Sequence, residues 1–289
     1  MRIFVTGASG WVGSAVTRDL VAHGHSVLGF ARSAAGAKVV ADAGGDVHRG
    51  SLEDLDSLRT GTQACEGVVH CAFIHDFTQF EANCRADAAA IEAIGTVLGD
   101  KPLITTSGTL GLARGRLGTE DDIAEPGPRK SEALALDLAK RGMRAMTVRL
   151  SPSVHGTGDH GFMAILIRHA REKGYALYVG DGANRWPAVH RFDAAPIYRL
   201  ALERGTAGSR WHGVADEGVQ LRQVAELIGR KLGVPAVAKT PQEATAELGF
   251  IGMVLGADVP ASNALTRERL GWKPTGPSLL EDLEQHYFA

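Results

Sequence analysis

The sequence lacks any apolar run of 18 residues, and it lacks an N-terminal stretch in which positive charges precede an apolar segment. A membrane-spanning helix needs about 20 mostly apolar residues, and a secretory leader needs a charged region followed by an apolar one. We therefore expect a soluble, cytoplasmic protein with no membrane partner.

Cysteine is scarce, and neither sign of charge is in excess. Cys65, Cys71 and Cys84 show no C-x-x-C or histidine-linked spacing, so the sequence predicts neither a disulfide framework nor a metal site. The 31 lysines and arginines nearly balance the 33 aspartates and glutamates, for a formal net charge of −2. A nucleic-acid partner requires a basic surface, and this composition does not predict one.

Glycine is abundant, and three glycines directly follow the first apolar segment in M-R-I-F-V-T-G-A-S-G-W-V-G. The pattern predicts a βαβ unit, with a strand over residues 2–6, a helix over residues 14–23 and a strand over residues 26–30. A backbone that passes close to a diphosphate must lack Cβ atoms, and the free N–H groups of a helix start attract the anion. We therefore expect a dinucleotide cofactor at Gly7, Ser9, Gly10, Trp11, Val12 and Gly13.

The rest of the chain continues to alternate apolar strands with helical stretches. This alternation predicts an α/β fold with a doubly wound parallel sheet, that is, a Rossmann fold. Further strands are expected over residues 46–49, 67–71, 102–106 and 145–150, and helices over residues 77–98 and 129–141. We assign residues 1–150 to the cofactor domain. Residues 151–289 form a mixed segment that builds a small substrate lobe and returns to the first domain.

Beyond residue 150 the pattern is patchier. Short strands are expected over residues 176–179 and 210–214, and helices over residues 162–173, 193–203, 221–232, 262–270 and 279–286.

Three motifs resemble those of the extended and atypical short-chain dehydrogenase/reductases. They are T-G-A-S-G-W-V-G near the N-terminus, V-R-L-S-P-S-V-H-G-T-G-D from Val148, and V-G-D-G-A-N-R-W-P-A-V-H-R-F-D-A-A from Val179. The last two are also similar to segments of sugar-nucleotide epimerases. The resemblance implies NAD(P) bound on a doubly wound sheet, and by analogy it implies a homodimer.

The end of the second strand predicts which cofactor is bound. An acidic side chain there would favour NADH, but Ala31 occupies the position, followed by Arg32 and Ser33. A guanidinium and a hydroxyl suit the 2′-phosphate of NADPH. The resemblance also implies adenine contacts at Ser51 and Leu52. The remaining cofactor contacts are expected at the strand ends, from Cys71, Ala72, Phe73, Thr105, Pro152, Ser153 and Val154.

The chemical signature of the resembling family is incomplete here. Ser107 fits its serine, which supports the oxyanion. Setting P-R-K-S-E against Y-x-x-S-K puts Pro128 at the tyrosine and Glu132 at the lysine, and a shift by one residue puts Arg129 and Ala133 there. Neither register restores the tyrosine and lysine, which places the chain among the atypical members.

Another group must then supply the proton. His155, which follows the sixth strand where the family commonly has a tyrosine, is the first candidate. His75 is the second, with Asp76 available to orient the ring or raise its pKa. Tyr175 and Tyr178 come third.

The sequence favours an NADPH-dependent reductase of a small, mostly apolar aldehyde or ketone, with Ser107 binding the carbonyl oxygen. Arg185, beside Trp186, is a candidate to hold a phosphate or a carboxylate, or else to form a structural salt bridge. Two alternatives remain: a non-catalytic NADPH-binding redox sensor, and an epimerase, dehydratase or isomerase with a tightly held cofactor. Substrate contacts are expected from Phe77, Thr109, Leu110, Phe162 and Trp186.

Overall fold

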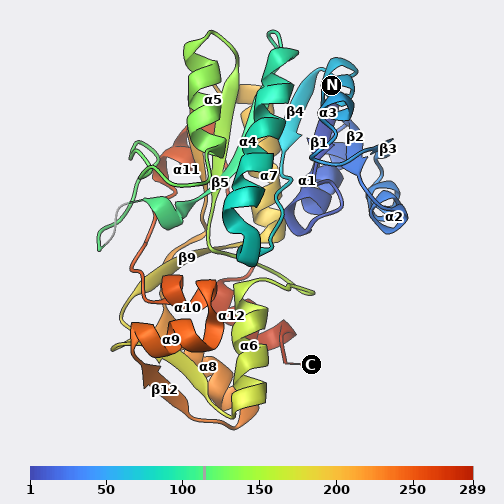
Figure 1. Cartoon of the computed structure of the whole chain (residues 1–289). Helices are drawn as coiled ribbons and strands as arrows, with labels where there is room; N and C mark the ends of the chain where they lie inside the picture. The colour runs from blue at the N-terminus through green and yellow to red at the C-terminus, as the bar shows by residue number, and fades with distance from the viewer. Residues whose placement is uncertain (113–114, 289) are drawn as a thin grey trace.

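The computed structural model describes residues 1–112 and 115–288 of the chain. Two parts are stacked on one another, with the N-terminus in the larger and the C-terminus in the smaller (Figure 1). The larger part contains a seven-stranded parallel sheet in the order β10-β6-β5-β4-β1-β2-β3. Its strands are β1 (Arg2–Thr6), β2 (Ser26–Ala31), β3 (Asp46–Arg49), β4 (Gly67–His70), β5 (Leu103–Gly108), β6 (Ala145–Leu150) and β10 (Arg210–Gly213).

Helices bury both faces of this sheet. Alternate strand residues face opposite ways, so Ile3 and Val5 join one apolar core and Phe4 joins the other. The first core is covered by α1 (Trp11–Ala22), α2 (Ala34–Asp42) and α7 (Arg191–Arg204). The second is covered by α3 (Leu55–Gln63), α4 (Phe80–Thr96) and α5 (Ser131–Lys140). The predicted doubly wound α/β fold is confirmed.

The smaller part has its own core around the buried Trp186. A three-stranded sheet consists of β7 (Ser153–His155), β9 (Arg185–His190) and β11 (Asp216–Gln220), and a two-stranded sheet consists of β8 (Ala176–Val179) and β12 (Ala236–Lys239). The helices here are α6 (Phe162–Lys173), α8 (Leu221–Leu232), α9 (Pro241–Leu248), α10 (Phe250–Leu255) and α12 (Leu279–His286).

The chain crosses between the two parts several times after β6. It leaves for the smaller part at β7, returns to the large sheet at α7 and β10, and leaves again at β11. The short strand expected over residues 210–214 therefore extends the large sheet beside β6. Several chain segments thus connect the two parts, and we call the region between them the waist (Figure 1).

Some elements differ from those expected. The helix expected over residues 77–98 is divided into a 3₁₀ turn, η1 (Phe77–Gln79), and α4, and Asp76 caps the turn by accepting a hydrogen bond from Thr78 N. The sequence pattern did not reveal α2, α3, α9, α10, β7, β9, β11 or β12, which are short and depend on tertiary contacts. The last described helix of the larger part is α11 (Ala264–Leu270). No helix among the described residues is long and apolar enough to cross a membrane.

Candidate active site

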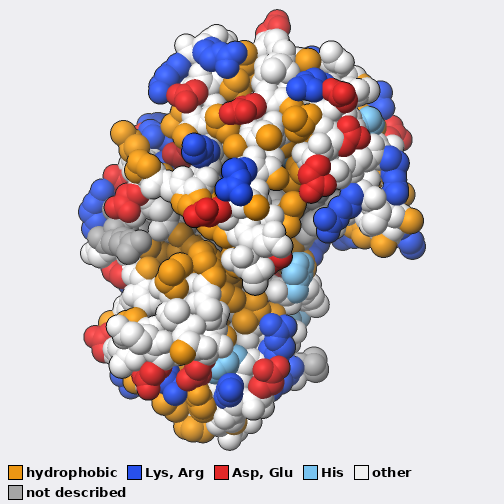
Figure 2. Space-filling view, viewed as in Figure 1, with side chains coloured by type: hydrophobic (Ala, Val, Ile, Leu, Met, Phe, Trp, Pro, Cys, Tyr) orange, Lys and Arg blue, Asp and Glu red, His pale blue; other side chains and the backbone are white. Residues whose placement is uncertain are grey.

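A cleft of about 1650 Å³ lies at the waist, beyond the carboxyl ends of the strands of the large sheet. Ligands of doubly wound sheets bind at this edge. The wall of the cleft extends from the glycine loop, past the ends of β4, β5 and β6, to α6 and α10 of the smaller part. Figure 2 shows hydrophobic side chains gathered in the hollow between the two parts.

The glycine loop has the backbone geometry that a diphosphate site requires. Gly7 has a φ of 67°, and a Cβ there would lie 2.7 Å from Ala72 N, while a Cβ on Gly13 would lie 2.1 Å from Gly7 O. Backbone packing alone thus demands glycine at both positions. Gly10 begins α1 without a side-chain cap, so the N–H groups of the first turn remain available to an anion.

Trp11 ties the glycine loop to the chain after β6. Its Nε1 donates a hydrogen bond to Val154 O (2.7 Å), and the Arg191 guanidinium stacks on its ring at 4.0 Å. Every residue predicted to contact the cofactor between Gly7 and Gly13 lines the cleft. The residues present therefore fit a dinucleotide cofactor.

The far end of the cleft is lined by Arg32, Ser51 and Leu52, whose contacts with the cofactor stay a prediction. Ser33 does not line it: its hydroxyl caps α2 by accepting a hydrogen bond from Gly36 N (3.0 Å). Ser33 is exposed and its O–H remains free to donate, so its contact with the 2′-phosphate stays a prediction. Glu53 also lines this end, with Oε2 3.5 Å from Ser51 Oγ.

The strand ends bring most of the other predicted cofactor residues to the cleft. The residues that line it are Cys71, Ala72, Phe73, Pro152, Ser153 and Val154. The predicted cofactor contact from Thr105 is wrong, because this residue is buried inside β5 and its hydroxyl donates to Thr147 Oγ1 (3.0 Å). Burial raises the pKa of Cys71 to about 11, so its thiol is protonated at neutral pH.

Ser107 is half-buried at the end of β5 and lines the cleft, as predicted. None of the described side chains forms a hydrogen bond with its hydroxyl, which therefore remains available to a ligand. Thr109 also lines the cleft, and its Oγ1 is buried without a described partner. The Ser107 hydroxyl is thus available on this wall, whereas the Thr109 hydroxyl is enclosed.

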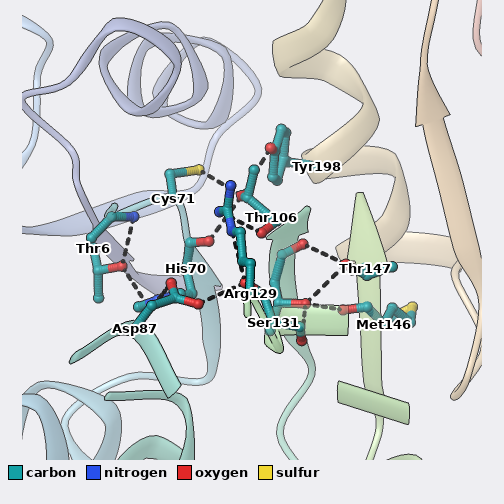
Figure 3. A network of polar contacts seen from close by, with 12 residues as sticks. Thr6, His70, Cys71, Asp87, Thr106, Arg129, Ser131, Met146, Thr147 and Tyr198 are labelled. Carbon is teal, nitrogen blue, oxygen red and sulfur yellow. Dashed lines mark hydrogen bonds and ion pairs between the residues drawn. The ribbon is translucent and has the colours of Figure 1, made fainter. Parts of the chain in front are cut away.

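Arg129, which the sequence comparison considered and set aside, is held at this same wall. Its Nη2 donates to Thr106 O (2.8 Å), its Nε donates to Ser131 Oγ (3.0 Å), and its guanidinium lies 4.2 Å from the centre of the Phe73 ring. Figure 3 shows Arg129 at the centre of this network, between the strand ends that carry Cys71 and Thr106. In the sequence, Arg129 is a lone arginine just before a predicted helix. Spacing alone does not distinguish such an arginine from an ordinary surface residue.

A buried polar chain connects Arg129 with the glycine loop. Ser131 Oγ donates to Asp87 Oδ2 (2.6 Å), Asp87 Oδ1 lies 3.2 Å from His70 Nε2, and His70 Nδ1 lies 2.8 Å from Thr6 Oγ1 (Figure 3). Burial alone would raise the pKa of Asp87, but His70, Arg129 and Ser131 together hold it below its usual value. Asp87 is therefore a charged anchor for this wall.

Glu132, aligned with the family lysine, serves a structural role. It is buried and pairs with the fully buried Arg149, whose Nε lies 2.7 Å from Glu132 Oε2. Pro128, aligned with the tyrosine, is exposed at the rim of the cleft. Among the described residues that line the cleft there is no tyrosine.

His155 is not brought to the cleft, so its proposed role as proton donor is corrected. The side chain is fully buried, and its Nδ1 lies 2.7 Å from Asp282 Oδ2 of α12. Packing between β7 and α12 therefore determines its orientation. Tyr175 and Tyr178 are also remote from the cleft, because Tyr175 donates to Glu247 and Tyr178 packs under Arg222.

His75 does line the cleft, with its ring edge against Phe73 at 5.2 Å. Desolvation by the surrounding cleft wall, with the charge of Arg129, lowers the pKa of His75, although the residue is exposed at the mouth of the cleft. Contrary to the prediction, Asp76 neither orients the ring nor raises its pKa, because its carboxylate accepts hydrogen bonds from Thr78. His75 is therefore a largely neutral imidazole at pH 7.

Four of the predicted substrate residues line the cleft, namely Phe77, Thr109, Leu110 and Phe162. Trp186 is corrected: it is fully buried in the core of the smaller part, where its Nε1 donates to Ala257 O (3.1 Å). Arg185 pairs with Asp258, which identifies it as a structural arginine.

Aromatic side chains form a wall that spans both parts. Phe77 stacks on Phe250 with ring centres 4.6 Å apart, and Phe80 lies 5.5 Å from Phe250. Phe77 and Phe80 come from the larger part and Phe250 from α10. The sequence pattern missed Phe250 because only tertiary folding brings it to the cleft.

Several known proteins are similar to this chain in sequence or in fold. The profile of the NAD dependent epimerase/dehydratase family matches residues 3–97. An uncharacterized protein of Schizosaccharomyces pombe is 48% identical over 98% of each chain, and another of Saccharomyces cerevisiae is 40% identical over 99% of each chain. The chain belongs to the NAD-dependent epimerase/dehydratase family.

More distant relatives have names that state an activity. A 4-hydroxy-2-methyl-3-oxo-4-farnesyl-3,4-dihydroquinoline-1-oxide ketoreductase of Stigmatella aurantiaca is 29% identical, over 91% of this chain and 84% of the relative. Among solved structures, the dTDP-glucose 4,6-dehydratase DesIV of Streptomyces venezuelae superposes with a TM-score of 0.79 at 19% identity, over 99% of this chain and 96% of that one. This structural likeness shows the shared fold.

Proposed function

We propose that this protein is an NADPH-dependent reductase that converts the carbonyl group of an apolar substrate to an alcohol. One observation carries the proposal: a single cleft joins the glycine loop to an aromatic pocket, and Ser107 lies on its wall. A cofactor and a substrate would therefore meet in the same enclosed space. Such proximity is a large part of the rate enhancement in reactions between two bound partners.

The cofactor would be held by the chain's own backbone and by one arginine. The free N–H groups at the start of α1 would bind the diphosphate, and Arg32 would bind the 2′-phosphate that distinguishes NADPH from NADH. When bound, reduced nicotinamide supplies the hydride. Ala31 provides no carboxylate to repel a phosphate at the end of β2.

On the substrate side, Ser107 donates a hydrogen bond to the carbonyl oxygen and stabilises the negative charge that develops there. His75 is the predicted proton carrier that does lie in the cleft. A neutral imidazole relays a proton by accepting one from water at one nitrogen and giving one from the other. Phe77, Phe162 and Phe250 surround the apolar body of the substrate and exclude water.

Two relatives support a reductase within this family. One is the ketoreductase of Stigmatella aurantiaca, and the other is a 2-alkyl-3-oxoalkanoate reductase of Stenotrophomonas maltophilia, 28% identical over 83% of this chain and 78% of the relative. Both are named for the reduction of a ketone.

The test is oxidation of NADPH, followed by its absorbance, with a panel of aldehydes, ketones and oxo acids, and with NADH in parallel. Consumption of NADPH with formation of one alcohol per cofactor is the expected result. Product without net loss of NADPH would instead identify an isomerase or dehydratase. Tight NADPH binding without turnover of any compound would identify a cofactor sensor.

A further inference from the structure

Arg129 lines the cleft and keeps free hydrogen-bond donors, while its other donors are bonded to neutral groups. Its Nε donates a hydrogen bond to Ser131 Oγ, and one N–H of Nη2 donates to Thr106 O. A guanidinium carries five N–H donors, so both donors at Nη1 and the second at Nη2 remain. Phe73 covers one flat face at 4.2 Å and fixes the plane of the group. The free edge is thus oriented in advance for a planar anion.

Arg129 forms no salt bridge with a carboxylate of the described residues. Across residues 1–112 and 115–288, no carboxylate oxygen lies within 4.0 Å of its guanidinium. Asp87 is connected to it only through the hydroxyl of Ser131. The buried Arg149, in contrast, is paired directly with Glu132. Arg129 therefore keeps its capacity to bind an anion from the cleft.

Arg129 also lies next to the expected position of the reacting carbonyl. Its Nη2 contacts the carbonyl oxygen of Thr106, and Ser107 is the next residue on β5. Successive strand residues are about 3.3 Å apart, so an anion on Arg129 lies close to a carbonyl on Ser107. Both side chains line the same cleft.

Apolar side chains of the cleft extend to its mouth. Ile123 is 83% exposed and Met253 is 59% exposed, and both line the cleft. Met253 lies on α10 with Phe250, which stacks on Phe77. Exposed apolar side chains at the rim of a site are typical of contacts with an apolar ligand. The cleft thus presents the Arg129 guanidinium, held in place by Thr106, Ser131 and Phe73, and an apolar path toward solvent.

We infer that Arg129 binds a carboxylate of the substrate, so that the compound reduced is an oxo acid with an apolar chain; this inference rests on the proposed reductase function. The carboxylate pairs with the free edge of Arg129, the ketone oxygen accepts a hydrogen bond from Ser107, and the chain contacts the phenylalanines. In the reaction the carbonyl carbon gains a hydride and its oxygen gains a proton. The carboxylate is unchanged, because its role is recognition.

The test compares a medium-chain oxo acid with its own methyl ester, which keeps the ketone and removes the charge. For the unaltered protein, kcat/KM should be higher for the acid. Arg129→Met should raise KM for the acid by about ten- to a hundredfold and change KM for the ester by less than about threefold. Arg129→Lys keeps the positive charge but lacks the paired N–H donors of a guanidinium. Its KM for the acid should therefore lie between that of the unaltered protein and that of Arg129→Met.

Arg141→Met is the matched control, because Arg141 is an exposed arginine at the other end of α5. It should leave both KM values unchanged. Thermal unfolding and NADPH titration of each variant show whether the protein is folded and loaded. If Arg129→Met folds but loses NADPH binding, Arg129 holds the cofactor and the inference is wrong. Equal losses for acid and ester would also overturn it.

A binding measurement separates failure of this inference from failure of the reductase proposal. Calorimetry should detect the hydroxy acid, but not its methyl ester, binding to the protein loaded with NADP⁺. Arg129→Met should abolish that heat. If no carbonyl compound is reduced and yet the hydroxy acid binds through Arg129, the reductase proposal fails and the carboxylate site stands. If the acid and the ester bind equally, the carboxylate site fails.

Discussion

His155 Nδ1 lies 2.7 Å from Asp282 Oδ2, joining β7 to the helix α12 near the end of the chain. Both side chains are buried, and His286 also lies 3.2 Å from the same carboxylate. The contact connects segments more than a hundred residues apart. It explains why a histidine in the expected position for a proton donor has a structural role.

This geometry predicts that His155→Leu lowers stability and leaves catalysis intact. Leucine cannot hydrogen-bond to the buried Asp282 carboxyl group, and losing one partner of such a buried hydrogen bond costs about 2–4 kcal/mol, which urea unfolding measures. The kcat of the folded variant should stay within about twofold, because His155 does not line the cleft. A large fall in kcat without loss of stability would return His155 to the mechanism.

Ser107→Ala should lower kcat by about one to three orders of magnitude, because the developing charge on the carbonyl oxygen loses a hydrogen bond. Affinity for NADPH should be nearly unchanged, since the glycine loop is separate from Ser107. Steady-state kinetics with fluorescence titration of NADPH measure both quantities. Equal rates in the variant and the parent would remove Ser107 from the mechanism.

Arg32→Asp should reverse the preference between cofactors. The aspartate repels a 2′-phosphate and accepts a hydrogen bond from the 2′-hydroxyl of NADH. The ratio of kcat/KM for NADPH to that for NADH should fall by at least about tenfold. Arg49→Asp is the control, because Arg49 lies close to Arg32 but does not line the cleft. An unchanged ratio of the two kcat/KM values for Arg32→Asp would show that another group binds the 2′-phosphate.

His212 should make the protein less stable in mild acid. Burial, together with the nearby Arg149, lowers its pKa to about 4 although Ser262 O accepts a hydrogen bond from its Nδ1. Its pKa when unfolded is about 6.5, so the unfolded state binds more protons between these values. Stability should therefore be full above about pH 6.5 and fall by about 3 kcal/mol as pH decreases toward 4.

The measurement is urea unfolding across that pH range, with His212→Gln as the comparison. Glutamine does not titrate, and its amide offers one donor and one acceptor for the two contacts of His212. The variant should lose this part of the pH dependence. A pH profile identical to that of the parent would assign the acid sensitivity to other groups.

The cofactor end of the site could be predicted from sequence because its requirements are local. Gly7, Gly10 and Gly13 lie within one strand–turn–helix unit, and the fit of that unit depends on residues that are neighbours in the chain. Arg32 directly follows β2, so its place at the edge of the sheet follows from the strand that precedes it. The alternation of strands and helices likewise predicts the parallel sheet.

The substrate end could not be predicted in the same way, because it is assembled from distant segments. Arg129 acquires its orientation from Thr106 and from the hydroxyl of Ser131, and Phe250 reaches the cleft from a helix that the sequence pattern missed. Thr105 and Trp186 were predicted at the site, but packing places both in the interior. Position along the chain does not determine which way such side chains face.

The amino-acid sequence by itself determined the doubly wound sheet and the glycine-rich turn, because hydrophobic periodicity and backbone sterics act over short distances. The tertiary structure decided which side chains meet in the cleft. It buried His155 against Asp282 and left Arg129 facing the cavity with free donors. Contacts between remote segments set these orientations, and no local pattern encodes them.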